Sequence, residues 1–118
     1  MTAITLYGIP NCDTVKRARA WLADHGIAVT FHDYKKAGVP EPRLDAWLQA
    51  LGWEPLVNRQ GTTWRKLDDA TKDGVHDAAS ARALMLQQPS VIKRPVVEWA
   101  NGQVTVGFQP DDWSARLG

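Results

Sequence analysis

The sequence predicts a small α/β protein with a β-α-β start, a helical middle, a β-hairpin and a C-terminal helix. Three observations carry this prediction. A β-prone run at residues 4–7 precedes a helical pattern, the middle of the chain has apolar residues mainly at helical spacing, and an Asn101-Gly102 pair lies between two β-prone runs. The 118 residues, 44% of them hydrophobic, suffice for one core. We therefore expect residues 1–118 to form a single domain.

The chain opens with a strand and a helix. Residues 4–7 (ITLY) are β-prone, and Gly8 and Pro10 end the run. The spacing of apolar residues then predicts a helix from about residue 13 to residue 25, and Gly26 is suited to the position just after it. The apolar positions of this helix are Val15, Ala18 and Leu22.

A second strand and a second helix follow. Residues 27–34 predict a strand with Val29 and Phe31 on one face, and the polar residues 33–38 end it. Pro40 suits the first turn of a helix that Gly52 ends. The apolar stripe of that helix is Leu44, Trp47, Leu48 and Leu51. A β-α-β start implies two parallel strands, and ligands of such sheets bind beyond the carboxyl ends of the strands, where residues 8–12 lie.

The stretch from residue 58 to residue 89 predicts a loop and further helices. Residues 58–63 (NRQGTT) have loop composition, and residues 64–67 predict a short helical turn. A helix is expected over about residues 77–88, closed by Pro89. Its inward positions are Ala81, Leu84 and Met85.

The C-terminal part predicts a hairpin and a last helix. Residues 95–99 and 103–108 are β-prone, and the Asn-Gly pair between them is the strongest hairpin signal in the chain. Asp111 and Asp112 open a short helix.

Composition excludes several classes of function. The formal charge is +1 with both signs interspersed, so neither a nucleic acid nor an anionic membrane is expected as a partner. No stretch approaches the roughly 20 apolar residues that span a bilayer, and the first residues lack the basic and apolar regions of a signal peptide. One cysteine cannot form an intrachain disulfide. We therefore expect a reducing cytoplasmic location.

The single cysteine, Cys12, is the candidate nucleophile. It lies where the unpaired N–H groups of the first helix would stabilise a thiolate, and Lys16 adds positive charge while Asp13 opposes it. The structural alternative is a small buried hydrophobe. The polar turn around Cys12 favours a reactive thiol. Because Val15 stands three positions on, there is no C-x-x-C, and any redox cycle needs a second thiol from another molecule.

Other polar residues give weaker signals. Arg94 precedes Pro95 at the start of a predicted strand, and Arg59 and Arg65 flank Trp64, but each is also compatible with an ordinary surface cation. The three histidines have no metal-ligand spacing, so no metal site is expected. The six tryptophans favour core positions over a platform for stacking bases.

Three segments in order along the chain resemble the arsenate reductase (ArsC)/Spx family, in its YffB-like branch. They are residues 7–14 (YGIPNCDT), 61–67 (GTTWRKL) and 92–97 (IKRPVV). The resemblance implies a thioredoxin-like fold with a helical insertion. It also implies that Cys12 is the nucleophile, that Arg94 faces the thiol and that the Arg94-Pro95 bond is cis. YffB-like proteins are thought to be glutathione-dependent thiol reductases.

The resemblance also implies a set of substrate-binding residues. At two positions the chain departs from the arginine pattern of the family. Glutathione-coupled arsenate reductases place three arginines around the oxyanion. Here Arg94 is retained, Arg59 is displaced by one position, and Gln109 stands where the third arginine is expected. The expected site is completed by residues for binding substrate. These are Asn11, Arg59, Arg65 and Pro95.

The lone thiol and the family resemblance together imply a glutathione-dependent monothiol reductase. We expect Cys12 to attack a disulfide or oxyanion, with glutathione or a similar thiol as co-substrate and no bound cofactor. Glutaredoxin is a further candidate partner, and a monomer is expected. The alternative is a non-enzymatic Spx-like regulator that docks on RNA polymerase, and a third hypothesis is a fold that retains Cys12 only as a structural residue.

Overall fold

The structure, a computed structural model, describes residues 4–117. The chain divides into two compact units, Met1–Asp33 with Arg94–Gly118, and Tyr34–Lys93. That residues 1–118 form a single domain stays a prediction.

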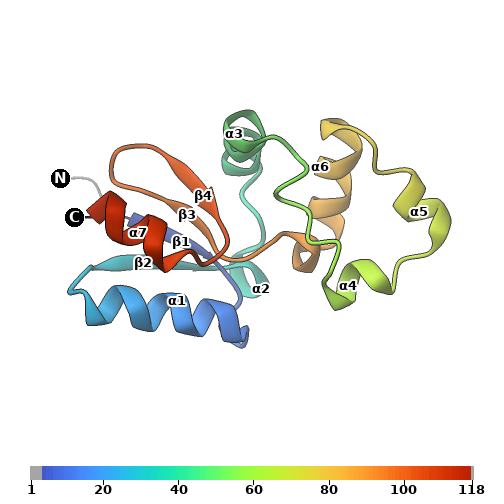
Figure 1. The fold of residues 1–118 in the computed structure, drawn as a ribbon. Coiled ribbons are helices and arrows are strands. Elements are labelled where there is room, and N and C mark those ends of the chain that lie inside the picture. The colour runs from blue at the N-terminus through green and yellow to red at the C-terminus, as the bar shows by residue number, and fades with distance from the viewer. Residues whose placement is uncertain (1–3, 118) are drawn as a thin grey trace. The chain divides into compact units, whose positions relative to one another are not determined.

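The first unit contains a mixed four-stranded sheet. Its strands are β1 (Ile4–Gly8), β2 (Val29–Asp33), β3 (Val96–Glu98) and β4 (Val104–Val106), in the order β2-β1-β3-β4 (Figure 1). Strands β1 and β2 are parallel, whereas β3 pairs antiparallel with both β1 and β4. This arrangement confirms the predicted β-α-β start and the hairpin, and the fold is thioredoxin-like.

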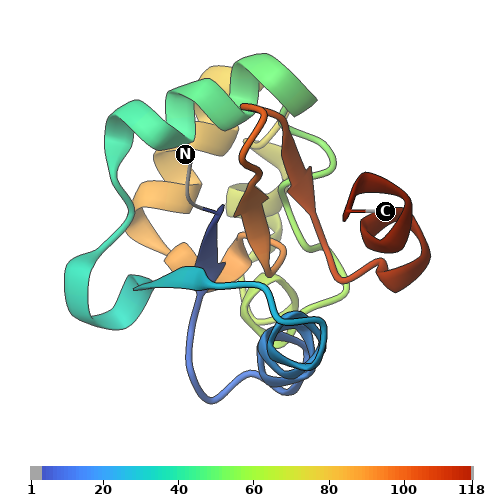
Figure 2. The ribbon, with the colours of Figure 1, turned by 90° about the vertical axis from the view of Figure 1, so that its left-hand side faces the viewer.

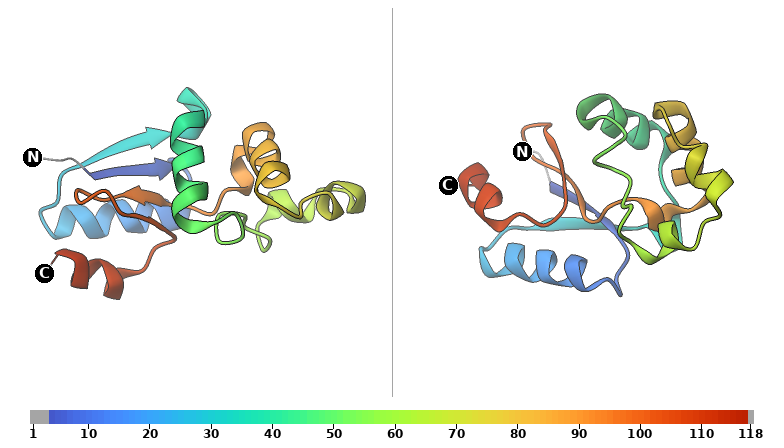
Figure 3. Two further views of the ribbon diagram at one scale, coloured as in Figure 1. Left: turned by 90° about the horizontal axis from the view of Figure 1, so that it is seen from above. Right: turned by 45° about the vertical axis from the view of Figure 1, so that its right-hand side comes forward.

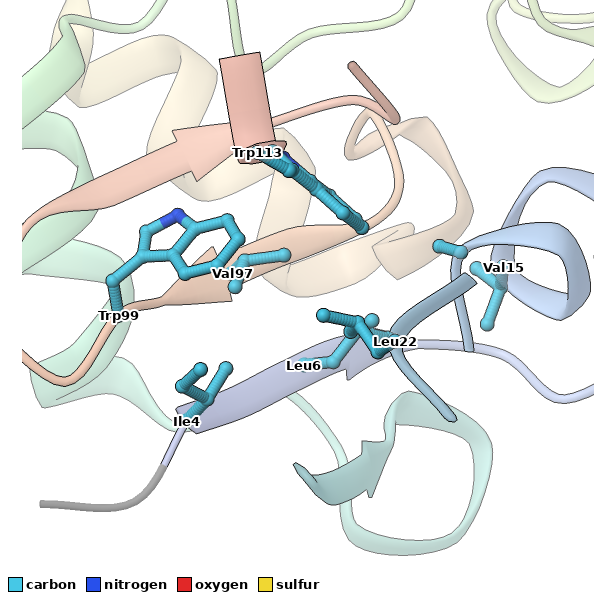
Figure 4. Packing of buried hydrophobic residues seen from close by; sticks show 8 residues of the cluster. Ile4, Leu6, Val15, Leu22, Val97, Trp99 and Trp113 are labelled. Atoms are coloured by element: carbon cyan, nitrogen blue, oxygen red, sulfur yellow. The ribbon is translucent and has the colours of Figure 1, made fainter. Parts of the chain in front are cut away.

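Helices α1 (Asp13–Asp24) and α7 (Pro110–Leu117) lie on the same side of the sheet, as Figures 1 and 2 show. They cover a core to which both the strands and the helices contribute (Figure 4). Its buried residues are Ile4, Leu6, Val15, Ala18, Leu22, Val97, Trp99 and Trp113. The predicted inward face of α1 is therefore confirmed.

The hairpin between β3 and β4 follows its turn sequence. Gly102 has φ 89°, a region that favours glycine. The Gly102 N–H donates to the Trp99 carbonyl at 2.9 Å, and the Trp99 N–H donates to the Gln103 carbonyl at 2.8 Å. The Asn101 side chain accepts from the Gln103 N–H at 3.0 Å. The observed β3 and β4 are shorter than the predicted ranges 95–99 and 103–108, although the Trp99–Gln103 bond continues the pairing beyond them.

Gly8 allows the end of β1 to pack closely on α1. A Cβ at this position would lie 2.8 Å from Cγ2 of Val15, and Val15 is fully buried. A β-branched side chain locked in a core cannot move away cheaply. The glycine therefore fixes the approach of the loop that carries Cys12.

Replacing Gly8 by alanine is expected to destabilise the protein by about 1–3 kcal/mol, because the new methyl overpacks the core. The midpoint of urea unfolding measures this. Gly74→Ala is the control, since its Cβ would meet only backbone oxygens at 3.4 Å. Equal midpoints for the two variants would show that β1 and α1 are not closely packed here.

The second unit is helical, and Figure 3 gives two views of its elements. Helices α3 (Glu41–Leu51) and α6 (Ala78–Gln87) are joined at the surface by Arg82, whose guanidinium bonds Asp45 at 2.6 Å and Glu41 at 3.0 Å. A 3-10 turn, η1, follows α6. The elements are α2 (Tyr34–Ala37), α3 (Glu41–Leu51), α4 (Thr62–Arg65), α5 (Asp69–Asp73), α6 (Ala78–Gln87) and η1 (Pro89–Val91).

Two predictions for this unit were wrong and one was incomplete. Residues 34–37 form helix α2 instead of a polar end of the second strand, and β2 stops at Asp33. Helix α4 starts at Thr62, inside the predicted loop. Helix α5 was not predicted; Asp68 caps it by accepting the Thr71 N–H at 2.8 Å. The other helices lie within about a turn of their predicted ranges.

Within residues 4–117, no helix is long and apolar enough to cross a membrane. In the same range, no three His, Cys, Asp or Glu side chains gather so that they could hold a metal ion.

Candidate functional site

The register of the sheet brings the loop before α1 and the segment before β3 to one edge. Strand β1 ends at Gly8, and its Tyr7 pairs with Val96, the first residue of the antiparallel β3. Arg94 and Pro95, which precede β3, therefore lie where β1 ends. Strand β4 ends at the same edge, where the Gly107 N–H donates to the Pro95 carbonyl at 2.8 Å.

Cys12 is the N-cap residue of α1. Its backbone is extended (φ −90°, ψ 126°), and its carbonyl accepts the Lys16 N–H at 2.9 Å, which begins the helix. Its own N–H donates to the Ile9 carbonyl at 3.3 Å, so residues 9–12 form a turn. The side chain is half-buried and packs against the core of the first unit. The thiol thus lies between the core and the unpaired N–H groups of a helix start.

The pKa of Cys12 lies below its ordinary value because favourable contacts outweigh burial. Burial of the thiol raises this pKa, and the N–H groups of Val15 and Thr14 lower it. A hydrogen bond from the Arg94 side chain and its positive charge lower it further. No side-chain capping bond of ordinary geometry forms at this N-cap. We therefore attribute the part of the pKa decrease that comes from the backbone to the N–H dipoles of the first helical turn, which stabilise the thiolate.

Lys16 and Asp13, which the sequence suggested as local charges, are exposed. Neither is among the groups that shift the pKa of Cys12. The N–H groups of Thr14 and Val15 were not singled out from the sequence. The signal for them was the helix start itself, which leaves its first N–H groups without intrahelical partners.

The lowered pKa predicts a pH profile for the thiol. Alkylation of folded Cys12 should reach half its maximal rate below the roughly pH 8.5 of an ordinary cysteine. Because the folded pKa is below the unfolded one, ionisation of Cys12 favours folding. This stabilisation is complete above the unfolded pKa and is lost as pH falls through the folded pKa. Rates of iodoacetamide labelling against pH, with urea-unfolded protein as reference, measure the difference. Identical midpoints would contradict an activated thiol.

The predicted cis bond between Arg94 and Pro95 is confirmed. Arg94 is half-buried and Pro95 is buried, whereas Asn11 is exposed in the turn before Cys12. The structure brings Cys12 and Arg94 together, since the Arg94 side chain donates a hydrogen bond to Cys12. Gln109 is exposed and lies beyond the end of β4, at the same edge of the sheet as Cys12.

Arg59 and Arg65 belong to the second unit and are exposed. The Arg59 guanidinium lies over the rings of Trp53 and Trp64, at 5.4 and 5.9 Å from their centroids. Arg65 is the last residue of α4. Their assignment to substrate binding stays a prediction.

Comparison with known proteins identifies the family. The model of the ArsC family matches residues 7–116, which includes Cys12, Arg59 and Arg94. The chain belongs to the ArsC family.

Individual relatives of this ArsC family member span nearly its whole length. A solved structure of a YffB protein is 50% identical, with a TM-score of 0.92 over 98% of this chain and 100% of that one. An uncharacterized protein of Haemophilus influenzae is 41% identical over 97% of this chain and 98% of that protein. The global transcriptional regulator Spx of Streptococcus mutans is 26% identical over 97% of this chain and 82% of that protein.

Proposed function

We propose that this ArsC-family protein is a monothiol reductase that uses Cys12 as nucleophile and a small thiol as reductant. One observation carries the proposal. Cys12, at the start of α1, is paired with Arg94, and this pairing lowers the pKa of the thiol. A half-buried cysteine that kept only a packing role would have no need of a guanidinium beside its sulfur.

The reaction proceeds by two thiol–disulfide exchanges. The Cys12 thiolate attacks one sulfur of a disulfide, the S–S bond breaks, and the departing sulfur leaves as a thiolate that takes up a proton. The mixed disulfide on Cys12 is then attacked by an external thiolate, which regenerates the Cys12 thiolate. One cycle therefore converts the disulfide and one external thiol into one released thiol and a mixed disulfide. A second cycle, with a second external thiol, reduces this mixed disulfide, so that in total one disulfide becomes two thiols and two external thiols become one disulfide. In both steps Arg94 stabilises the Cys12 thiolate as attacking or leaving group.

Glutathione is the proposed reductant, because the chain has no second cysteine to resolve the adduct. Asn11, Pro95, Arg59 and Arg65 are the proposed substrate-binding residues. The proposal includes a monomeric, cytoplasmic protein without a bound cofactor, and it keeps glutaredoxin as a further candidate reductant.

The test is turnover of a small symmetrical disulfide with reduced glutathione, followed through glutathione reductase and NADPH. We expect a rate that depends on protein and glutathione concentrations and that exceeds the uncatalysed exchange. A rate no higher than that of an unfolded sample with the same thiol concentration would refute the proposal.

Arsenate is expected to be a poor substrate. Three arginines would share the charge of a bound oxyanion, whereas Gln109 stands at the third position here. Loss of one charge-assisted contact costs about 1.5–3 kcal/mol, or at least roughly tenfold in affinity. Steady-state assays of arsenate reduction with glutathione and glutaredoxin test this. Gln109→Arg should lower the KM for arsenate, and efficient turnover by the unaltered protein at low arsenate would show that another cation replaces the missing arginine.

A second candidate function is docking on RNA polymerase, which the similarity to Spx regulators favours. Docking requires a binding surface but no thiolate. The docking hypothesis therefore predicts that a variant without the Cys12 sulfur keeps the effect of the wild-type protein in the cell. The reductase proposal predicts the opposite.

A further inference from the structure

The second unit has a polar groove of about 510 Å³ whose lining includes Arg59, one of the proposed substrate-binding residues. Small-molecule sites usually measure roughly 300–1,000 Å³, so the groove could hold a ligand of that size. All its lining residues come from Tyr34–Lys93. Those that carry the argument are Glu54, Val57, Asn58, Arg59, Gln60 and Lys93.

A short backbone pairing fixes the two walls of the groove. Val57 and Ile92 form an isolated antiparallel bridge. The Lys93 N–H donates to the Leu56 carbonyl at 2.7 Å, and the Asn58 N–H donates to the Val91 carbonyl at 2.7 Å. Lys93 is therefore held beside the segment that carries Glu54 and Arg59.

Within the described residues, the charged side chains of the groove are not neutralised by an oppositely charged side chain. Across residues 4–117, the side chains of Glu54, Arg59 and Lys93 form no hydrogen bond or ion pair with another residue. Elsewhere in the unit, Arg82 is paired with two carboxylates. The guanidinium of Arg59 is instead oriented by the faces of two indole rings, which leaves its N–H groups available to a ligand.

We propose that this groove binds a small molecule that carries a carboxylate and an ammonium group on one carbon, as an amino acid or a γ-glutamyl peptide end does. Arg59 and Lys93 would pair with the carboxylate, and Glu54 would pair with the ammonium. The Asn58 side-chain oxygen already accepts the Gln60 N–H at 3.1 Å, so Asn58 can offer its side-chain N–H₂ group to a peptide-like backbone. The Gln60 side-chain amide can both donate and accept. The choice of ligand rests on the proposed function, because the γ-glutamyl end of glutathione has this pair of charges.

The test is binding of S-methylglutathione, which cannot exchange disulfides, to the full chain by calorimetry. Arg59→Gln and Lys93→Gln should each weaken binding about tenfold. Arg17→Gln and Lys66→Gln remove the same charges at exposed positions outside the groove, and they should leave the affinity unchanged. Glu54→Gln should weaken binding of S-methylglutathione and should strengthen binding of its N-acetylated form, which lacks the ammonium.

Equal affinity of the groove variants and their controls would overturn the proposal. So would inorganic phosphate binding as tightly as S-methylglutathione with no effect of Glu54→Gln, because the groove would then be a simple anion site. The adduct on Cys12 is measured separately by mass. An adduct without groove binding refutes this inference alone, and groove binding without an adduct refutes the proposed function alone.

Discussion

Replacing Cys12 by serine is expected to reduce turnover of small disulfides to the uncatalysed rate, a loss of several orders of magnitude for a true nucleophile. Serine preserves the N-cap position and is a preferred N-cap residue, so the fold should be retained. The measurement is the glutathione-coupled assay, with circular dichroism to verify folding.

The same variant separates the two candidate functions. If a Cys12→Ser strain keeps the phenotype of the wild type while a deletion strain loses it, the protein acts by docking and the reductase proposal is wrong. If the serine strain resembles the deletion strain, the thiol is required. Thr14→Ala is a matched control, because it changes a neighbouring side chain and leaves the N–H groups of the helix start in place.

Replacing Arg94 by alanine is expected to raise the pKa of Cys12 and to slow adduct formation at neutral pH by at least about tenfold. The physical reason is the loss of both the guanidinium hydrogen bond and its charge at the thiolate. Labelling rates against pH give the pKa, and mass spectrometry gives the rate of adduct formation with oxidised glutathione.

Two further variants give this experiment its controls. Arg94→Lys retains a positive charge and should recover part of the shift, whereas Arg17→Ala removes an exposed arginine of α1 and should change nothing. An Arg94→Ala profile that coincides with the wild-type profile would remove Arg94 from the site. The helix N-terminus would then be the sole source of thiol activation.

The elements of the first unit could be predicted because local and long-range signals agree there. The β-prone run at 4–7 and the apolar spacing of Val15, Ala18 and Leu22 belong to elements that pack on each other. The Asn101-Gly102 pair predicts the hairpin turn, because the turn needs a positive φ and Gly102 adopts one. The Arg94-Pro95 geometry, by contrast, came from family resemblance, since most X–Pro bonds are trans.

The second unit was predicted less well because its short helices depend on single contacts. Tyr34 is aromatic and buried, so it is compatible with a strand as well as with the helix that it begins. Helix α5 has only five residues, and its signal, Asp68 three positions before Thr71, is common in loops as well. The groove needed two segments far apart in sequence, around Val57 and Ile92, to pair.

The most direct test of the central claim is the intact mass of the folded protein after mixing with oxidised glutathione at neutral pH. The account predicts the addition of one glutathionyl group, located on Cys12 by peptide mapping and removed by excess reduced glutathione. A folded protein that stays unmodified, but whose Cys12 reacts once urea unfolds the chain, would contradict it, because the thiol would then be a residue of the core and not a nucleophile.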